Sequence, residues 1–154
     1  MRTWRTESAA QTRDLGERLA HELVPGGILL LSGALGAGKT TLVQGVAAGL
    51  GLDPKEIQSP SYTLVREHAG PRGRLVHIDL YRLGSREADA LGLDEILDGP
   101  GVKAVEWPDR LRFPVPGGLH LELRLLAGGE RRIDEVEPAV TGAKELNDMV
   151  AEVR

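Results

Sequence analysis

A glycine-rich octapeptide at residues 33–40, Gly-Ala-Leu-Gly-Ala-Gly-Lys-Thr, limits the possible folds of this chain more than any other part of its sequence. It fits the pattern of one glycine, four free positions and then Gly-Lys-Ser/Thr, which is typical of phosphate-binding loops. Glycine at positions 33, 36 and 38 lets backbone N–H groups approach an anion closely, because no Cβ intervenes. Lys39 would bring a cation to the β- and γ-phosphates, and the Thr40 hydroxyl would coordinate Mg²⁺.

The segments on either side of the octapeptide predict a buried strand and a helix. Residues 28–32, Ile-Leu-Leu-Leu-Ser, form the short apolar run that a parallel strand covered on both faces requires. Residues 41–50 place apolar side chains at helical spacing, namely Leu42, Val43, Val46 and Leu50. Strand, glycine loop and helix in this order predict that the chain binds a nucleoside triphosphate.

Two further apolar segments end in a carboxylate. Residues 75–79 end at Asp79, and residues 102–106 end at Glu106. A phosphate-binding loop needs such an acid at a neighbouring strand end, where it holds Mg²⁺ directly or through water. Either acid alone would be ordinary, but together with the octapeptide they favour an ATP–Mg²⁺ site. His77 lies two residues before Asp79 on the same strand face, and a structural histidine is the favoured interpretation there.

The remaining segments predict a three-layer α/β fold of the P-loop NTPase type, as one domain over residues 1–154. Ser8 and Gln11 have capping-box spacing at the start of a helix. The other expected elements are strands at 3–6, 119–125 and 131–136, a hairpin turn at 70–73, and helices at 85–91, 93–97 and 143–150. The sheet should be mostly parallel, with an antiparallel extension formed by the hairpin at 119–136.

Residues 59–65, Ser-Pro-Ser-Tyr-Thr-Leu-Val, leave two interpretations open. The first is a plain turn that leads into a strand. The second is a switch-like segment whose hydroxyls reach the γ-phosphate or Mg²⁺. Arginines that could stabilise transition-state charge are Arg66, Arg72, Arg82 and Arg110, and the sequence does not choose among them.

Composition excludes several classes of function. A net charge of −4 and an aromatic content of 3% argue against a broad nucleic-acid-binding surface. The absence of cysteine excludes disulfides, zinc–thiolate sites and a thiol nucleophile. No apolar run reaches the ~20 residues of a membrane helix, and the first residues lack the apolar region of a secretory signal. We therefore expect a cytoplasmic protein with no membrane contact.

Four blocks occur together in a characteristic order. The octapeptide with Thr41 is followed by residues 59–65, by His-Ile-Asp-Leu-Tyr-Arg-Leu at 77–83 and by Val-Glu-Trp-Pro-Asp-Arg at 105–110. In order and spacing they resemble the bacterial TsaE family, formerly called YjeE. The resemblance runs from about residue 3 to about residue 136, and its motifs are specific when taken together.

The resemblance implies a small ATPase of the tRNA threonylcarbamoyladenosine (t6A) pathway. Such a protein would hydrolyse ATP with Mg²⁺, slowly alone and faster with the TsaB–TsaD complex. That complex installs the threonylcarbamoyl group on adenosine 37 of ANN-decoding tRNAs, so tRNA would be contacted only indirectly. The implied nucleotide-binding residues are Leu35, Gly36, Ala37, Gly38, Lys39, Thr40 and Thr41. The implied metal ligands are Thr40, Glu106 and Asp79, and the implied catalytic residues are Lys39, Asp79 and Glu106.

Two other functions remain as alternatives. A small-molecule P-loop kinase would need an acceptor pocket and usually an arginine-rich lid, whereas residues 84–101 contain one arginine, Arg86, and several acids. A nucleotide-dependent binding module with little hydrolysis is the second alternative. Stimulation of ATP hydrolysis by partner proteins would separate these functions.

Overall fold

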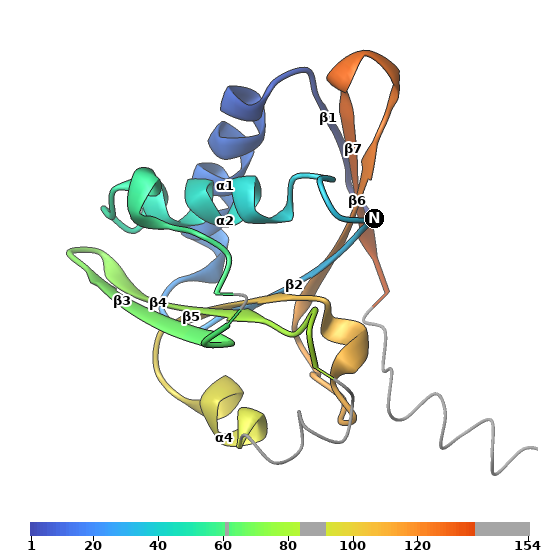
Figure 1. Ribbon diagram of the computed structural model, residues 1–154. Helices are drawn as coiled ribbons and strands as arrows, with labels where there is room; N and C mark the ends of the chain where they lie inside the picture. Colours follow the sequence, from blue (N-terminus) through green and yellow to red (C-terminus); the bar gives the residue numbers. More distant parts are fainter. Residues whose placement is uncertain (61, 84–91, 138–154) are drawn as a thin grey trace, which may run out of the picture.

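The computed structural model describes residues 1–60, 62–83 and 92–137, whose strands form one seven-stranded sheet (Figure 1). The strands are β1 (Thr3–Thr6), β2 (Ile28–Ser32), β3 (Val65–Gly70), β4 (Gly73–Asp79), β5 (Val102–Glu106), β6 (Leu119–Leu125) and β7 (Arg131–Val136). The α-helices of these ranges are α1 (Ala9–Leu23), α2 (Lys39–Gly49) and α4 (Leu93–Asp98). None of them is long and apolar enough to cross a membrane. The helices expected at 85–91 and 143–150 lie outside the described residues.

The sheet is parallel at its centre and antiparallel at both sides. Its strand order is β1-β7-β6-β2-β5-β4-β3, and β6, β2, β5 and β4 run parallel to one another. The hairpin of β6 and β7 confirms the predicted antiparallel extension, which β1 continues at the edge. At the other edge β3 pairs with β4 in a second hairpin. The α/β fold class predicted from the sequence is therefore confirmed.

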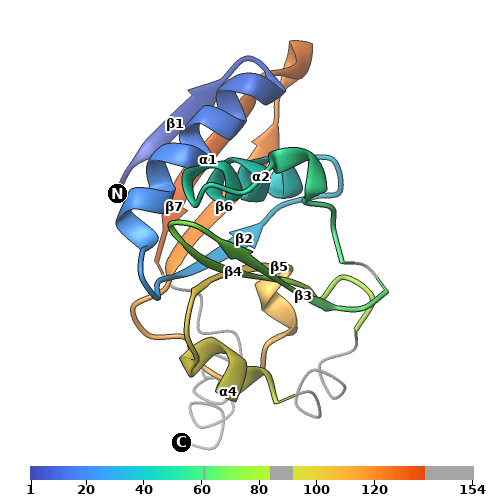
Figure 2. The ribbon, with the colours of Figure 1, turned by 90° about the vertical axis from the view of Figure 1, so that its left-hand side faces the viewer.

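Helices cover both faces of the sheet and make three layers (Figures 1 and 2). Helices α1 and α2 lie on one face, and the short α4 lies on the other. Strand β2 contributes side chains to the apolar cores on both faces of the sheet, because successive side chains of a strand point to opposite faces. Leu29 and Leu31 pack into the core beneath α1 and α2, whereas Leu30 belongs to the core on the α4 side. The run of apolar residues in this strand is thus explained by burial on both faces.

The cap of α1 follows its sequence signature closely. The Ser8 side chain accepts a hydrogen bond from the Gln11 backbone N–H at 3.1 Å. The Gln11 side chain accepts in return from the backbone N–H of Glu7 at 2.7 Å, one residue earlier than in the usual capping box. The first bond satisfies an N–H group that the first turn of a helix leaves without a partner, and the second holds the residue before the cap.

Helix α2 is held by glycine contacts along its side and by an arginine at its end. A Cβ at Gly45 would lie 2.0 Å from the carbonyl oxygen of Arg13, so α1 and α2 touch through their backbones here. Arg72, in the turn between β3 and β4, donates to the Gly49 and Ala48 carbonyl oxygens at 2.9 and 3.2 Å. This arginine therefore caps the C-terminal end of α2.

The backbone contact at Gly45 predicts that no larger side chain fits at this position of α2. In an exposed helix Gly→Ala stabilises by about 1 kcal/mol. Here we expect Gly45→Ala to destabilise the protein by about 1–3 kcal/mol, because the added methyl group forces the two helices apart. The measurement is the free energy of unfolding from urea denaturation, with the exposed Arg18→Ala on α1 as control. Unchanged or increased stability of Gly45→Ala would contradict the close contact.

Candidate functional site

The glycine loop, residues 33–40, leaves β2 and runs into the first turn of α2. At Gly33 φ is 148°, and a Cβ there would lie 2.5 Å from the carbonyl oxygen of Leu123. Gly38 is the N-cap residue of α2 with φ of 107°, and a Cβ there would lie 2.7 Å from Nε of Arg131. Both positions require glycine, which keeps the loop against β6 and β7. The N–H groups of the first turn have no acceptor within the helix and so can bind an anion.

Lys39 is the first residue of α2, and its side chain folds back over the loop. Its Nζ donates to the carbonyl oxygens of Gly33 and Ala34, the second at 3.1 Å. The ammonium also lies 4.1 Å from the centre of the Trp107 ring, within the range of a cation–π contact. Burial lowers the pKa of Lys39, and the nearby charge of Glu106 opposes that shift. A further anion in front of the loop would stabilise the charged form of this lysine.

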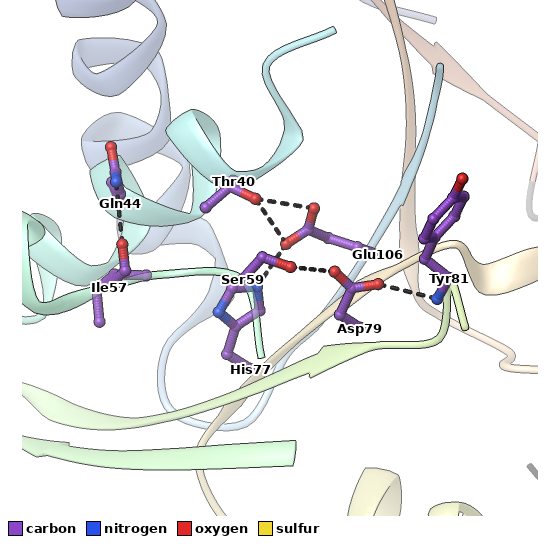
Figure 3. Close-up of polar contacts among 8 residues, drawn as sticks. All are labelled: Thr40, Gln44, Ile57, Ser59, His77, Asp79, Tyr81 and Glu106. Atoms are coloured by element: carbon purple, nitrogen blue, oxygen red, sulfur yellow. Dashed lines mark hydrogen bonds and ion pairs between the residues drawn. The ribbon is translucent and has the colours of Figure 1, made fainter. Parts of the chain in front are cut away.

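Glu106, at the end of β5, is the centre of the polar contacts (Figure 3). Its carboxylate accepts from the Thr40 hydroxyl at 3.0 Å through Oε1 and 3.1 Å through Oε2. Nε2 of His77, on the neighbouring β4, lies 2.6 Å from Oε2. The Glu106 side chain is almost fully buried, so these contacts replace the water that a carboxylate would otherwise bind.

Asp79 ends β4 and lies opposite Glu106 in the parallel pairing of β4 with β5. Its carboxylate accepts from the Ser59 hydroxyl and, at 2.9 Å, from the backbone N–H of Tyr81 (Figure 3). This contact places Ser59 at the site. The two strand-end acids are thus adjacent, and each is already oriented by hydrogen bonds.

The residue after Glu106 has an unusual backbone. Trp107 has φ of 62° and ψ of 53°, a left-handed conformation that costs about 1–2 kcal/mol for a non-glycine residue. Its N–H donates to the Leu31 carbonyl oxygen at 3.2 Å, and its ring lies 4.9 Å from that of Tyr81. This conformation turns the indole toward Lys39, where it forms one wall of the site.

These groups line one cavity of about 440 Å³. Its lining consists of Leu35, Gly36, Gly38, Lys39, Thr40, Thr41, Ser59, Asp79, Tyr81, Glu106, Trp107 and Arg131. The lining includes a lysine and the start of a helix, which suit phosphate groups. It also includes two carboxylates and the Thr40 hydroxyl, which are oxygen ligands of the kind that Mg²⁺ prefers.

The donor set fits a metal ion that is shared with a bound ligand. Within residues 1–60, 62–83 and 92–137, no three His, Cys, Asp or Glu side chains gather to form a metal site of their own. Mg²⁺ is usually bound by one or two carboxylates together with substrate phosphates and water. Thr40, Glu106 and Asp79 could therefore supply part of a coordination shell and leave positions for phosphate oxygens.

Most residues selected from the sequence converge on this cavity. Leu35, Gly36, Gly38, Lys39, Thr40, Thr41, Asp79 and Glu106 all line it. Ala37 differs, because its methyl group packs into the core and its N–H already donates to the Ala34 carbonyl oxygen at 3.1 Å. Ala37 therefore shapes the loop from behind.

Sequence reasoning gave no role to Tyr81 or Arg131, which line the cavity, and it favoured a structural role for His77. His77 contacts Glu106, and the only signal was its position two residues before Asp79. Arg131 lines the cavity, whereas none of the arginines proposed from the sequence does. Nε of Arg131 is buried and has no hydrogen-bond partner within the described part of the chain. Its place depends on how β7 folds against the glycine loop, which no local motif reveals.

Comparisons with known proteins agree with this fold. The sequence profile of the family described as "Threonylcarbamoyl adenosine biosynthesis protein TsaE" matches residues 6–133. A protein of Bacillus subtilis named tRNA threonylcarbamoyladenosine biosynthesis protein TsaE is 35% identical over 149 residues, which cover 97% of this chain and 90% of that protein. A protein of the same name from Synechocystis is 46% identical over 104 residues, covering 65% of this chain and 66% of its own length.

A solved structure extends the likeness to three dimensions. The crystal structure of YdiB from Bacillus subtilis superposes with a TM-score of 0.68 at 29% sequence identity. The superposition covers 99% of this chain and 96% of YdiB. The profile match includes the glycine loop and both strand-end acids. The chain belongs to the TsaE family of threonylcarbamoyl adenosine biosynthesis proteins.

Proposed function

We propose that this chain is a Mg²⁺-dependent ATPase that acts with the TsaB–TsaD complex in forming the threonylcarbamoyl group on adenosine 37 of ANN-decoding tRNAs. One observation carries the chemical part of the proposal. A lysine at the start of α2 and a carboxylate bonded to the adjacent Thr40 hydroxyl line the same cavity. Family membership supports the pathway, since relatives are named for t6A biosynthesis.

Different residues of the cavity would have different roles in phosphoryl transfer to water. The first-turn N–H groups of α2 and Lys39 would hold the phosphates, for which the Lys39 ammonium must leave the loop carbonyls that it now contacts. Thr40 and Glu106 would hold Mg²⁺, which supplies charge neutralisation at the phosphates when bound. Asp79, with Ser59 bonded to it, would orient the metal's ligands or the attacking water. Catalysis then rests on positioning and electrostatics.

Contact with tRNA would be made by the partner proteins. The chain has a net charge of −4, which gives little attraction for a phosphate backbone, and its aromatic content of 3% offers few stacking surfaces. We therefore assign this chain the role of an ATP-driven component that resets the complex between cycles. Transfer of the threonylcarbamoyl group would belong to the complex.

The proposal predicts that the partners accelerate ATP hydrolysis. We expect slow Mg²⁺-dependent release of phosphate by the purified protein and faster release after addition of TsaB and TsaD. Chelation of Mg²⁺ by EDTA should abolish both, because the metal neutralises charge on the transferred phosphoryl group. If the pair had no effect and a small metabolite became phosphorylated instead, a kinase would replace the proposed function.

Lys39 should be required for nucleotide binding. We expect Lys39→Ala to weaken ATP affinity about tenfold to a hundredfold, the loss expected when one charge-assisted contact to phosphate is removed. Isothermal titration calorimetry measures the affinity directly. Lys55→Ala, which removes an exposed lysine near the C-terminal end of α2, is the matched control and should bind like the wild type. Wild-type affinity in Lys39→Ala would contradict the role assigned to the glycine loop.

Glu106 should matter more for turnover than for binding. Glu106→Gln keeps the volume but removes the charge, so we expect kcat to fall about a hundredfold while nucleotide affinity without metal changes little. Single-turnover hydrolysis and calorimetry separate the two effects. The control is Glu122→Gln, a partly exposed acid on β6. Turnover at the wild-type rate in Glu106→Gln would refute the metal-binding role.

A further inference from the structure

His77 is a fully buried side chain with one strong polar contact. Its exposed fraction is 0%, and it lies on β4 within the parallel centre of the sheet. Nε2 is 2.6 Å from Oε2 of Glu106, and Figure 3 shows the imidazole beside the carboxylate. A carboxylate can only accept, so Nε2 carries the hydrogen of this bond.

The other ring nitrogen argues against a purely structural role. Nδ1 of His77 is buried and has no hydrogen-bond partner among the described residues. Leaving a buried polar atom unpaired costs about 1–3 kcal/mol. Leu75, whose side chain points to the same face two residues earlier, packs into the core without any such cost. If position 77 only had to fill space, an aliphatic side chain would do so without burying an unpaired nitrogen. We therefore look for the role of His77 in its bond to Glu106 through Nε2.

The bond distinguishes the two oxygens of Glu106. Oε2 accepts from both the imidazole and the Thr40 hydroxyl, whereas in the described contacts Oε1 accepts from Thr40 alone. Oε1 therefore keeps more of its capacity for a cation. Because β4 and β5 pair across this position, the backbone that carries the imidazole is held by the sheet.

We propose that His77 is a positioning residue that fixes the rotation of the Glu106 carboxylate, so that Oε1 faces the metal beside Thr40. This inference rests on the function proposed above, because it assumes that Glu106 binds Mg²⁺. Partners of metal-ligating groups commonly act in this way, and their loss costs about tenfold to a hundredfold in metal affinity or activity.

The test measures metal affinity directly. The protein is loaded with ADP and titrated with Mn²⁺, and electron paramagnetic resonance measures the free ion. We expect His77→Leu to raise the Mn²⁺ concentration at half saturation about tenfold to a hundredfold. His77→Gln should stay close to the wild-type value, because its amide nitrogen can donate from nearly the position of Nε2. ADP affinity without metal should remain unchanged in both variants.

A matched control separates positioning from general damage. His120, on β6, is buried to a similar degree, and its Nε2 lies 2.7 Å from the Ser32 hydroxyl. His120→Leu should lower the melting temperature much as His77→Leu does and leave Mn²⁺ affinity unchanged. Equal losses of Mn²⁺ affinity in both variants, or wild-type affinity in His77→Leu, would overturn the proposal.

The Mn²⁺ titration also separates a failure of the His77 role from a failure of the ATPase proposal. If the wild-type protein with ADP bound no Mn²⁺ at the site, the ATPase proposal itself would fail. If the wild type bound Mn²⁺ tightly, Glu106→Gln lost it and His77→Leu kept it, only the positioning role of His77 would fail.

Discussion

The parallel pairing of β2, β5 and β4 is the constraint on which the site depends. Parallel strands end at the same edge of a sheet, so the glycine loop after β2 and the acids that end β5 and β4 are brought together by backbone hydrogen bonds. The register places Leu31 opposite Glu106, and Glu106 opposite Asp79. A slip of one residue in either pairing would turn a carboxylate to the other face of the sheet.

The concentration of polar groups at that edge has an energetic cost. Lys39, Asp79 and Glu106 are each at most 5% exposed, and charges in such places must be compensated by neighbours. Hydrogen bonds from Thr40, Ser59 and His77 compensate the two carboxylates, and the carbonyl oxygens of Gly33 and Ala34 accept from the Lys39 ammonium. The left-handed backbone of Trp107 adds strain of the kind that often occurs at functional sites. The apolar cores on both faces of the sheet must provide the stability that this edge does not.

The sequence predicts local features well and long-range placement poorly. The cap at Ser8, the glycine loop and the strands that end in Asp79 and Glu106 are encoded in short patterns, and the structure confirms them. The contact of His77 with Glu106 depends on the register between two strands, which no single segment specifies. Arg131 reaches the cavity because β7 folds back beside Gly38. The backbone contact between α1 and α2 at Gly45 likewise appears only once the helices are packed.

The hydrogen bonds from Arg72 to the C-terminal end of α2 have a geometric consequence. Helix α2 has 11 residues and spans about 16 Å, and β4 has 7 residues and spans about 23 Å. Arg72 ties the helix to the turn that precedes β4, while Thr40 and Asp79 face the same cavity at the opposite ends of these two elements. The helix and the strand therefore form two sides of a frame that is closed by Arg72 at one end and by the cavity at the other. Insertions or deletions within either side would displace one wall of the cavity from the other, so among relatives that keep the site, length variation should be confined to the loops outside this frame.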